Sequence, residues 1–223
     1  MSALRFYLTN SVAKKQVMGV TGLLLCGFLL SHMLGNFLLM VGADAFNKYA
    51  YTLTSNPLIY VAEAGLLVIF LTHLFMALKL TMENKAARPV NYYMKQPTGR
   101  GATFASSTMP YTGMLILFFI IMHLINFKYG SVYMTTLNGM EVRDLYKTVI
   151  EYFASPLNVG MYVVFMIVIG IHVSHGFWSA FQSIGFNHPK YMPAIKFLSK
   201  LYAVVLTVGY STIAIWCHVK GGM

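Results

Sequence analysis

The chain has 223 residues, of which 57% are hydrophobic and only 10% are charged. This balance is too apolar for an ordinary soluble domain and predicts an integral membrane protein. The formal net charge is +10, but the chain has no basic, aromatic-rich soluble domain, so the charge argues against nucleic-acid binding and for Lys and Arg at the ends of membrane helices.

Five apolar stretches reach the length of about 20 residues that a helix needs to cross a bilayer core. They predict an all-α bundle of five transmembrane helices in a single domain, 1–223, with spans at roughly 16–41, 58–80, 109–127, 157–181 and 194–218. Proline marks three of the expected helix starts, at Pro57, Pro110 and Pro156, because a missing N–H costs nothing in a first turn. We expect a short helix in the connecting segment 141–153.

The N-terminal segment and the cysteines add little. Residues 1–16 show no cleavable signal pattern. Cys26 and Cys217 lie in different apolar stretches without a C-x-x-C-H motif, so covalent c-type haem attachment is not indicated. We interpret each cysteine as a small buried hydrophobe.

The charges between the spans predict an orientation. The N-terminal segment, the 80–108 loop and the 182–193 region, with the adjoining helix ends, carry eleven Lys and Arg residues, and the opposite side carries five, together with four of the six acidic residues. Because positive residues concentrate on the cytoplasmic side, we expect the N-terminus in the cytoplasm and the C-terminus outside.

Four of the five spans contain a histidine about two-thirds of the way along: His32, His73, His123 and His172. An ionisable side chain in hydrocarbon is costly and usually functional. Because successive helices run in opposite directions, His32 and His123 should lie about 6 Å toward the outside, and His73 and His172 a similar distance toward the cytoplasm. The two layers, about 12 Å apart, could each supply both axial ligands to one haem.

Other uses of these histidines fit the pattern less well. A single histidine could simply hydrogen-bond across helices, but four at matched depths favour ligands. Structural zinc usually takes four ligands close together, often including thiolates, whereas two layers of two fit haem. A proton-coupled transporter without haem is disfavoured because no inverted repeat of broken helices is evident.

A short repeat precedes two of the histidines. Met18-x-x-Thr21-Gly22 precedes His32, and Met109-x-x-Thr112-Gly113 precedes His123. In both cases the glycine stands ten residues before the histidine, close to three helical turns and hence on nearly the same face. Such a glycine leaves room for a macrocycle edge or for close helix packing. We therefore expect the repeat to mark the outer pair of histidines.

The segment His172-Val-Ser-His-Gly-Phe-Trp178 resembles a family pattern, H-x-S-x-G-aromatic-Trp. This pattern follows the fourth-helix ligand in the dihaem cytochrome b subunit of succinate dehydrogenases and fumarate reductases. Segments 9–15, 31–36, 45–50, 56–58, 85–90 and 187–191 are also similar, so the resemblance covers nearly the whole chain. It is closest to the single-subunit anchor with five helices and two haems.

The resemblance implies cofactors, partners and a location. His73 and His172 would hold the inner haem b, which receives electrons from an iron–sulfur subunit docked on the basic cytoplasmic face. A flavoprotein subunit would interconvert succinate and fumarate, so this chain would do no succinate chemistry itself. His32 and His123 would hold the outer haem b, which exchanges electrons with a membrane quinone, often menaquinone. The complex would lie in a bacterial cytoplasmic membrane, and a stand-alone transmembrane dihaem cytochrome b is the alternative.

Three further histidines remain. Depth in the helix and the family pattern favour His172 over His175, one turn away, which could instead be the ligand or a partner for a haem propionate. We expect His188 in a surface loop. His218, at the outer end of the last span, could be interfacial or near a quinone.

Three polar residues are candidates for the quinone site. Glu63, the one acid inside an apolar stretch, could relay protons to a quinone or contact headgroups and water. Asn36 and Asn126 follow the outer histidines by four and three residues, and could hydrogen-bond a quinone carbonyl or pack between helices. Some fumarate reductases carry a proton-conducting glutamate two residues before the fourth-helix ligand. Here that position is Gly170, which argues against such a path.

Overall fold

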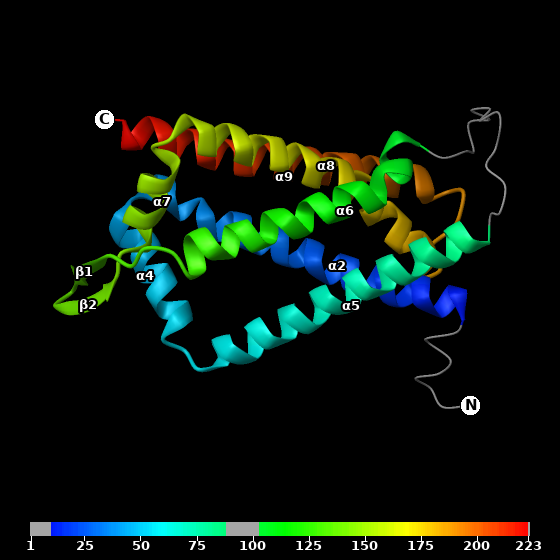
Figure 1. The fold of residues 1–223 in the computed structure, drawn as a ribbon, viewed down its shortest axis with the longest axis horizontal. Helices are drawn as coiled ribbons and strands as arrows, with labels where there is room; N and C mark the ends of the chain where they lie inside the picture. Colours follow the sequence, from blue (N-terminus) through cyan, green and yellow to red (C-terminus); the bar gives the residue numbers. More distant parts are fainter. Residues whose placement is uncertain (1–9, 88–102, 223) are drawn as a thin grey trace. The chain divides into compact units, whose positions relative to one another are not determined.

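The structure, a computed structural model, describes residues 10–87 and 103–222 and is mainly helical there (Figure 1). Arg5, Thr9, Arg88, Pro89, Val90, Lys95 and Arg100, used in the charge count or the family pattern, lie outside the described residues. The elements in chain order are α2 (Ser11–Asn36), α3 (Leu38–Val41), α4 (Ala43–Thr54), α5 (Leu58–Ala86), α6 (Phe104–His123), the π-helical turn η1 (Leu124–Lys128), β1 (Met134–Leu137), β2 (Met140–Arg143), α7 (Leu145–Phe153), α8 (Pro156–Ser183) and α9 (Met192–Gly221).

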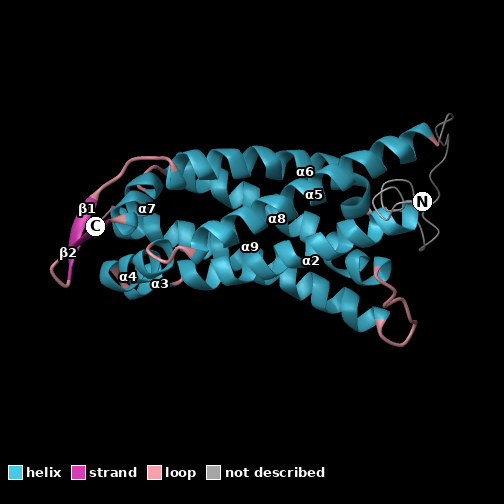
Figure 2. Cartoon of the chain, turned by 90° about the horizontal axis from the view of Figure 1, so that it is seen from below, coloured by secondary structure: helices cyan, strands magenta, loops and turns pink. Residues whose placement is uncertain are grey.

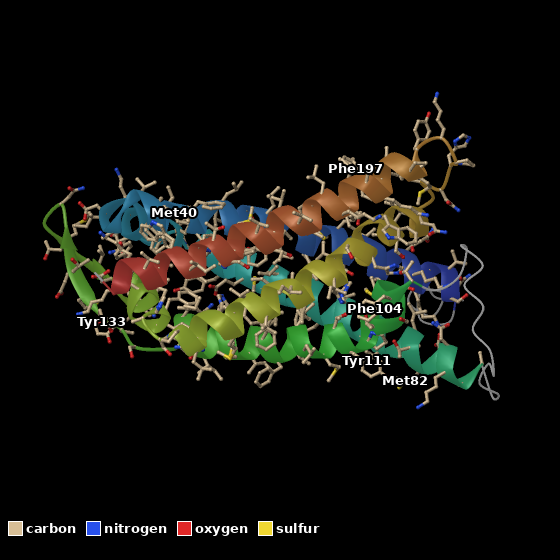
Figure 3. All side chains as sticks on the ribbon, turned by 90° about the horizontal axis from the view of Figure 1, so that it is seen from above. Met40, Met82, Phe104, Tyr111, Tyr133 and Phe197 are labelled. Atoms are coloured by element: carbon tan, nitrogen blue, oxygen red, sulfur yellow. The ribbon has the colours of Figure 1, made fainter. Side chains whose placement is uncertain are left out.

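Among the described residues, five helical segments are long and apolar enough to cross a membrane: Ser11–Val41, Leu58–Ala86, Phe104–Lys128, Pro156–Ser183 and Met192–Gly221. They contain the five predicted spans, so the number and order of the long helices are confirmed. Large apolar side chains such as Met82, Tyr111 and Phe197 are exposed and point outward from their helices (Figure 3). Such surfaces are stable in a bilayer, and the five helices indicate a multi-pass membrane protein.

Two of the long helices, α2 and α6, begin five residues earlier than predicted because polar residues cap them. The Asn10 side-chain oxygen accepts hydrogen bonds from the N–H groups of Val12 (2.9 Å) and Ala13 (3.2 Å), so α2 begins at Ser11. The Thr103 hydroxyl accepts a bond from the Ser106 N–H (3.1 Å), which starts α6 at Phe104. Such caps satisfy N–H groups that have no partner within the helix.

Pro110 therefore lies inside α6, and the prediction that it marks the helix start is wrong. Its ring removes the N–H that would bond the carbonyl four residues earlier. In the preceding turn the hydroxyls of Ser107 and Thr108 both donate to the Phe104 carbonyl at 2.9 Å. The other two proline boundaries are confirmed, since α5 begins directly after Pro57 and α8 begins at Pro156.

The segment between α6 and α8 contains more secondary structure than the single short helix that the sequence predicts. The expected short helix is α7, but Met140–Arg143 before it form β2, paired antiparallel with β1 (Figure 2). The strands join at Asn138 and Gly139, whose φ values are +50° and +79°. Positive φ at both central residues is typical of a two-residue hairpin turn, and the Asn-Gly pair is its usual sequence. The helix α4, in the loop after the first span, was also not predicted.

The described helices divide into two compact units. The first unit comprises residues 1–26, 66–114 and 171–203, and the second comprises 27–65, 115–170 and 204–223. Each of the five long segments contributes residues to both units. Counted from the sequence, the first unit has eleven Lys and Arg residues and one acid, and the second has five of each. The whole net charge of +10 therefore belongs to the first unit.

In the first unit, close backbone contacts and polar bonds join the helices. A Cβ at Gly19 of α2 would lie 3.3 Å from the backbone of Ala180 in α8, which explains why the smallest residue stands there. The Tyr202 hydroxyl of α9 donates to the Cys26 carbonyl of α2 at 2.5 Å. Lys14 of α2, only 2% exposed, forms an ion pair with Glu83 of α5, whose side chain is 43% exposed.

In the second unit, α9 bonds to both of its helical neighbours. The Tyr210 hydroxyl donates to the Leu29 carbonyl at 2.7 Å, and the Thr207 hydroxyl donates to the Met166 carbonyl at 3.2 Å. Outside the long helices, the buried Asn47 of α4 donates to the Asp144 carboxylate at 2.8 Å and accepts from the Tyr146 N–H at 2.9 Å. These bonds attach α4 to the first turn of α7.

Both cysteines are buried and unpaired, Cys26 in the first unit and Cys217 in the second. This agrees with their interpretation as small buried hydrophobes.

The Lys14–Glu83 pair predicts an asymmetric response to mutation. Glu83→Gln leaves a buried ammonium without a counter-ion and should lower the free energy of unfolding by about 3 kcal/mol. Lys14→Met places an apolar side chain in an apolar site and leaves a carboxylate that still reaches water, so it should cost about 1 kcal/mol or less. Thermal unfolding of both variants in the same detergent measures the difference. Equal losses would contradict a buried charge as the cause.

Candidate histidine sites

The four intramembrane histidines lie as two pairs, and each pair belongs to one compact unit. His73 of α5 and His172 of α8 are in the first unit, and His32 of α2 and His123 of α6 are in the second. These are the same pairs that alternating helix direction predicts.

The pair in the second unit has the spacing that a shared metal requires. The ring centres of His32 and His123 are 5.9 Å apart, with the ring planes 86° to one another. A metal held at about 2 Å from one nitrogen of each ring would separate the centres by roughly 6 Å. In the first unit, His172 is close enough to His73 for the two side chains to interact electrostatically.

The hydrogen bonds of His73 identify which ring nitrogen carries the proton. Its Nδ1 lies 3.2 Å from the Met18 carbonyl oxygen and 3.3 Å from the Thr21 hydroxyl, both on α2. A carbonyl oxygen can only accept, so Nδ1 donates and the neutral ring keeps the lone pair on Nε2. A histidine that binds metal through one nitrogen characteristically donates its other N–H in this way.

His172 has the same arrangement with a different helix. Its Nδ1 lies 3.0 Å from the Thr112 hydroxyl of α6. That hydroxyl has one proton, and the carbonyls of Thr108 and Met109 in its own helix, each at 3.1 Å, are available to accept it. The Thr112 oxygen then accepts from Nδ1–H, and Nε2 of His172 is again the nitrogen with the free lone pair.

The glycine that follows each threonine lies against the same histidine that the threonine contacts. A Cβ at Gly22 would lie 3.2 Å from Cε1 of His73, and a Cβ at Gly113 would lie 3.7 Å from Cε1 of His172. The expectation that the Met-x-x-Thr-Gly repeat marks the outer pair is therefore wrong, since the repeat contacts His73 and His172. Ten residues rise about 15 Å along a helix, so the glycine lies at another level than the histidine that follows it.

His123 is surrounded by aromatic side chains of the second unit. Its ring centre lies 5.2 to 6.3 Å from those of Phe119, Phe127 and Tyr162. The buried Tyr162 hydroxyl lies 3.4 Å from Nδ1 of His123 and also bonds to the Tyr152 hydroxyl. Burial raises the pKa of Tyr152, which keeps its phenol protonated. Neither tyrosine was predicted as part of the site. Tyr162 lies within an apolar span and Tyr152 in a connecting helix, and neither is marked by a motif or a spacing.

The predicted quinone residues are all in the second unit but do not form one cluster of free polar groups. Asn126 donates to the Tyr152 hydroxyl at 3.0 Å, which extends the polar chain from His123. Asn36 donates to the carbonyl of His32 at 2.8 Å, within its own helix. Glu63 is paired with Lys128, 2.5 Å away, and both side chains are about two-fifths exposed.

A π-helical turn begins directly after His123. Arg143 of β2 donates from Nη1 to the Lys128 carbonyl at 3.2 Å and from Nη2 to the Phe127 carbonyl at 2.9 Å. It thereby satisfies carbonyls that the end of the turn leaves without partners. Single π-turns are frequent at functional sites, and this one fixes where Asn126 projects relative to His123.

The other three histidines have different surroundings. His175 packs edge-on against Trp178 with ring centres 4.9 Å apart, and its buried Nδ1 has no hydrogen-bond partner among the described residues. His188 is exposed in a loop, as predicted, where its Nδ1 accepts from the Lys190 N–H. His218 Nδ1 lies 2.9 Å from the Phe153 carbonyl, beside the aromatic cluster.

The pairs of histidines suit a metal cofactor in which other atoms already bind the metal. Within the described residues, no group of three or more His, Cys, Asp or Glu side chains could hold a metal ion. Haem iron is already bound by the porphyrin nitrogens and takes its axial ligands from the protein. Two imidazoles with Nε2 lone pairs, buried in apolar surroundings, fit that need.

Compared with models of protein families, with curated proteins and with solved structures, the chain has no match. A functional proposal therefore rests on the histidine geometry, the charges and the sequence resemblance.

The exposure of Glu63 and Lys128 predicts that their ion pair adds little to stability. Glu63→Gln and Lys128→Met should each change the free energy of unfolding by less than about 1 kcal/mol, because both side chains remain hydrated. Thermal unfolding in detergent measures this. A loss of several kcal/mol in either variant would show that the pair is structural and would argue against Glu63 as a free proton relay.

Proposed function

We propose that the chain is the membrane-anchor and electron-transfer subunit of a succinate:quinone oxidoreductase, a succinate dehydrogenase or fumarate reductase. It would carry electrons through two b haems between an iron–sulfur subunit and a membrane quinone. The observation that carries the proposal is the presence of two histidine pairs, each drawn from two long apolar helices within one compact unit. The family resemblance of the sequence supports it.

His73 and His172 would be the axial ligands of one haem, and His32 and His123 those of the other. When bound, each haem supplies reversible one-electron transfer. The chain's residues contribute the ligand nitrogens, a surrounding from which water is excluded, and the hydrogen bonds that hold the imidazole rings. Such outer-shell partners orient the ligands and raise their basicity.

The charge distribution supports an orientation and a docking face. The first unit holds the whole positive excess, and by the positive-inside rule it would face the cytoplasm of a bacterial cell. The iron–sulfur subunit would dock on this basic face and the flavoprotein subunit would bind to it. The haem between His73 and His172 would then be the first to receive electrons during succinate oxidation. With five spans, the C-terminus would lie on the opposite side of the membrane from the N-terminus.

The second unit would serve the quinone, by family expectation often menaquinone. Quinone reduction takes protons as well as electrons, so it requires polar groups near the outer haem. The bonded series His123–Tyr162–Tyr152–Asn126 supplies such groups within this unit. Glu63, with its partner Lys128, is the carboxylate of this unit that lies in a long apolar helix.

Replacing single histidines should remove the haems selectively. We expect the purified wild-type chain to show b-type absorption with two haems per chain. His73→Ala or His172→Ala should remove one haem, and His32→Ala or His123→Ala the other. Reduced-minus-oxidised spectra with pyridine haemochrome quantification measure the loss, and His188→Ala is the control because His188 is in an exposed loop. No b-type absorption in the wild type, or loss of both haems in every folded histidine variant, would refute the proposal.

Purification of the native complex tests the partners. A tagged chain should co-purify with a flavoprotein and an iron–sulfur protein, and the preparation should reduce a menaquinone analogue when supplied with succinate, or oxidise the reduced analogue when supplied with fumarate. The His73→Ala complex should lose this activity while the flavoprotein still reduces a soluble dye with succinate. A dihaem chain that purifies alone and shows no succinate-dependent activity would instead be a stand-alone cytochrome b.

A further inference from the structure

We propose that Thr21 and Thr112 are positioning residues that hold the two histidines of the first unit, His73 and His172, by their Nδ1 atoms, and that they lower the reduction potential of the haem this pair would bind. This inference rests on the proposed function, because it assumes a haem between these histidines. It assigns a role to the Met-x-x-Thr-Gly repeat, which the histidine ligands by themselves do not explain.

The two threonines make matching contacts from different helices. Thr21 of α2 lies 3.3 Å from Nδ1 of His73 on α5, and Thr112 of α6 lies 3.0 Å from Nδ1 of His172 on α8. Both hydroxyls also lie within 3.1 Å of the carbonyls three and four residues earlier in their own helices. Both threonines are more than nine-tenths buried. Two separate parts of the sequence thus build the same contact.

The helix carbonyls determine the direction of the hydrogen bonds. Each threonine hydroxyl has one proton, which it donates to a carbonyl of its own helix, so its oxygen is left to accept from the imidazole N–H. An N–H that donates makes the imidazole a more basic ligand. A more basic ligand stabilises oxidised iron over reduced iron, so both threonines should lower the potential of the same haem.

The glycine after each threonine allows the imidazole to approach. At Gly22 an added Cβ would be 3.2 Å from the His73 ring, closer than ordinary contact, and the ring would have to shift. At Gly113 the corresponding distance is 3.7 Å, which is ordinary van der Waals contact. The repeat therefore combines an acceptor for Nδ1 with room for the ring, and the two copies should differ in their tolerance of alanine.

The second unit lacks this combination at His123. There the group nearest Nδ1 is a phenol hydroxyl at 3.4 Å, supplied by Tyr162 of α8. Changing either threonine should therefore affect one haem and leave the haem of the second unit as an internal reference.

The test compares Thr21→Val and Thr112→Val with Thr21→Ser, Thr112→Ser and Thr108→Val in the purified chain. Valine keeps the shape and removes the hydroxyl, which is the acceptor for His172 and one of two acceptors for His73, beside the Met18 carbonyl. Serine keeps the hydroxyl. Thr108 is the matched control, since it lies one turn before Thr112 and bonds to the carbonyls of Phe104 and Ala105 in its own helix. Redox titration monitored by visible absorption gives the potential of each haem, and electron paramagnetic resonance reports the ligand field of the oxidised iron.

We expect Thr112→Val to raise the potential of the first-unit haem by about 59 mV, which is a tenfold change in its reduction equilibrium. Thr21→Val should raise it less, because the Met18 carbonyl, 3.2 Å from Nδ1 of His73, still accepts from that N–H. The serine variants and Thr108→Val should stay at the wild-type value, and the second haem should not move. Gly22→Ala should alter the resonance spectrum of the first-unit haem more than Gly113→Ala does.

Full haem content with unchanged potentials in both valine variants would overturn the inference while leaving the proposed function intact. Loss of that haem in the valine variants but not in the serine variants would support it. Loss in the serine variants and in Thr108→Val as well would overturn it, because the helices would then be sensitive to any change. A wild-type chain that binds no haem would refute the proposed function instead.

Discussion

A neutral imidazole in hydrocarbon has one N–H that needs an acceptor and one nitrogen whose lone pair stays unused unless something binds it. The arrangement of the first unit follows from this requirement. His73 gives its N–H to α2 and His172 gives its N–H to α6, so each histidine ties its own helix to a neighbour and keeps the lone pair on its other nitrogen. A residue type that is costly in a membrane thus becomes a helix contact.

Hydroxyl groups make this arrangement compatible with a membrane. Many threonine and serine side chains of the described helices donate their protons to carbonyls of their own helix, as Thr81 does to Ala77. Such bonds leave the helix intact and consume no partner from elsewhere. At Thr21 and Thr112 the oxygen that remains is used a second time, as an acceptor for histidine. The helices can thereby offer buried acceptors without breaking their backbone ladder.

How much the sequence could predict depends on how local each signal is. The number of spans follows from summed hydropathy and could be predicted. The grouping of the histidines into pairs follows from their depth and from the alternating direction of the helices, so it could be predicted as well. Binding of haem stays a prediction. The caps Asn10 and Thr103 and the turn at Asn138 are local signals that could have been used. The contacts of Gly22 and Tyr162 could not be predicted, because they depend on which helix lies alongside, and one sequence without contacts does not contain that information.

The repeat on α2 and α6 also restricts how the length of this chain can change. Between Gly22 and His32, and between Gly113 and His123, the helix must deliver two groups in fixed directions: the glycine against a histidine of the first unit, and its own histidine into the second unit. One inserted or deleted residue turns everything beyond it by about 100°, which would send either the glycine or the histidine toward lipid. The nine intervening positions can therefore accept many substitutions but no change in number. Variation in length among descendants of this chain should be confined to the connections between the long helices.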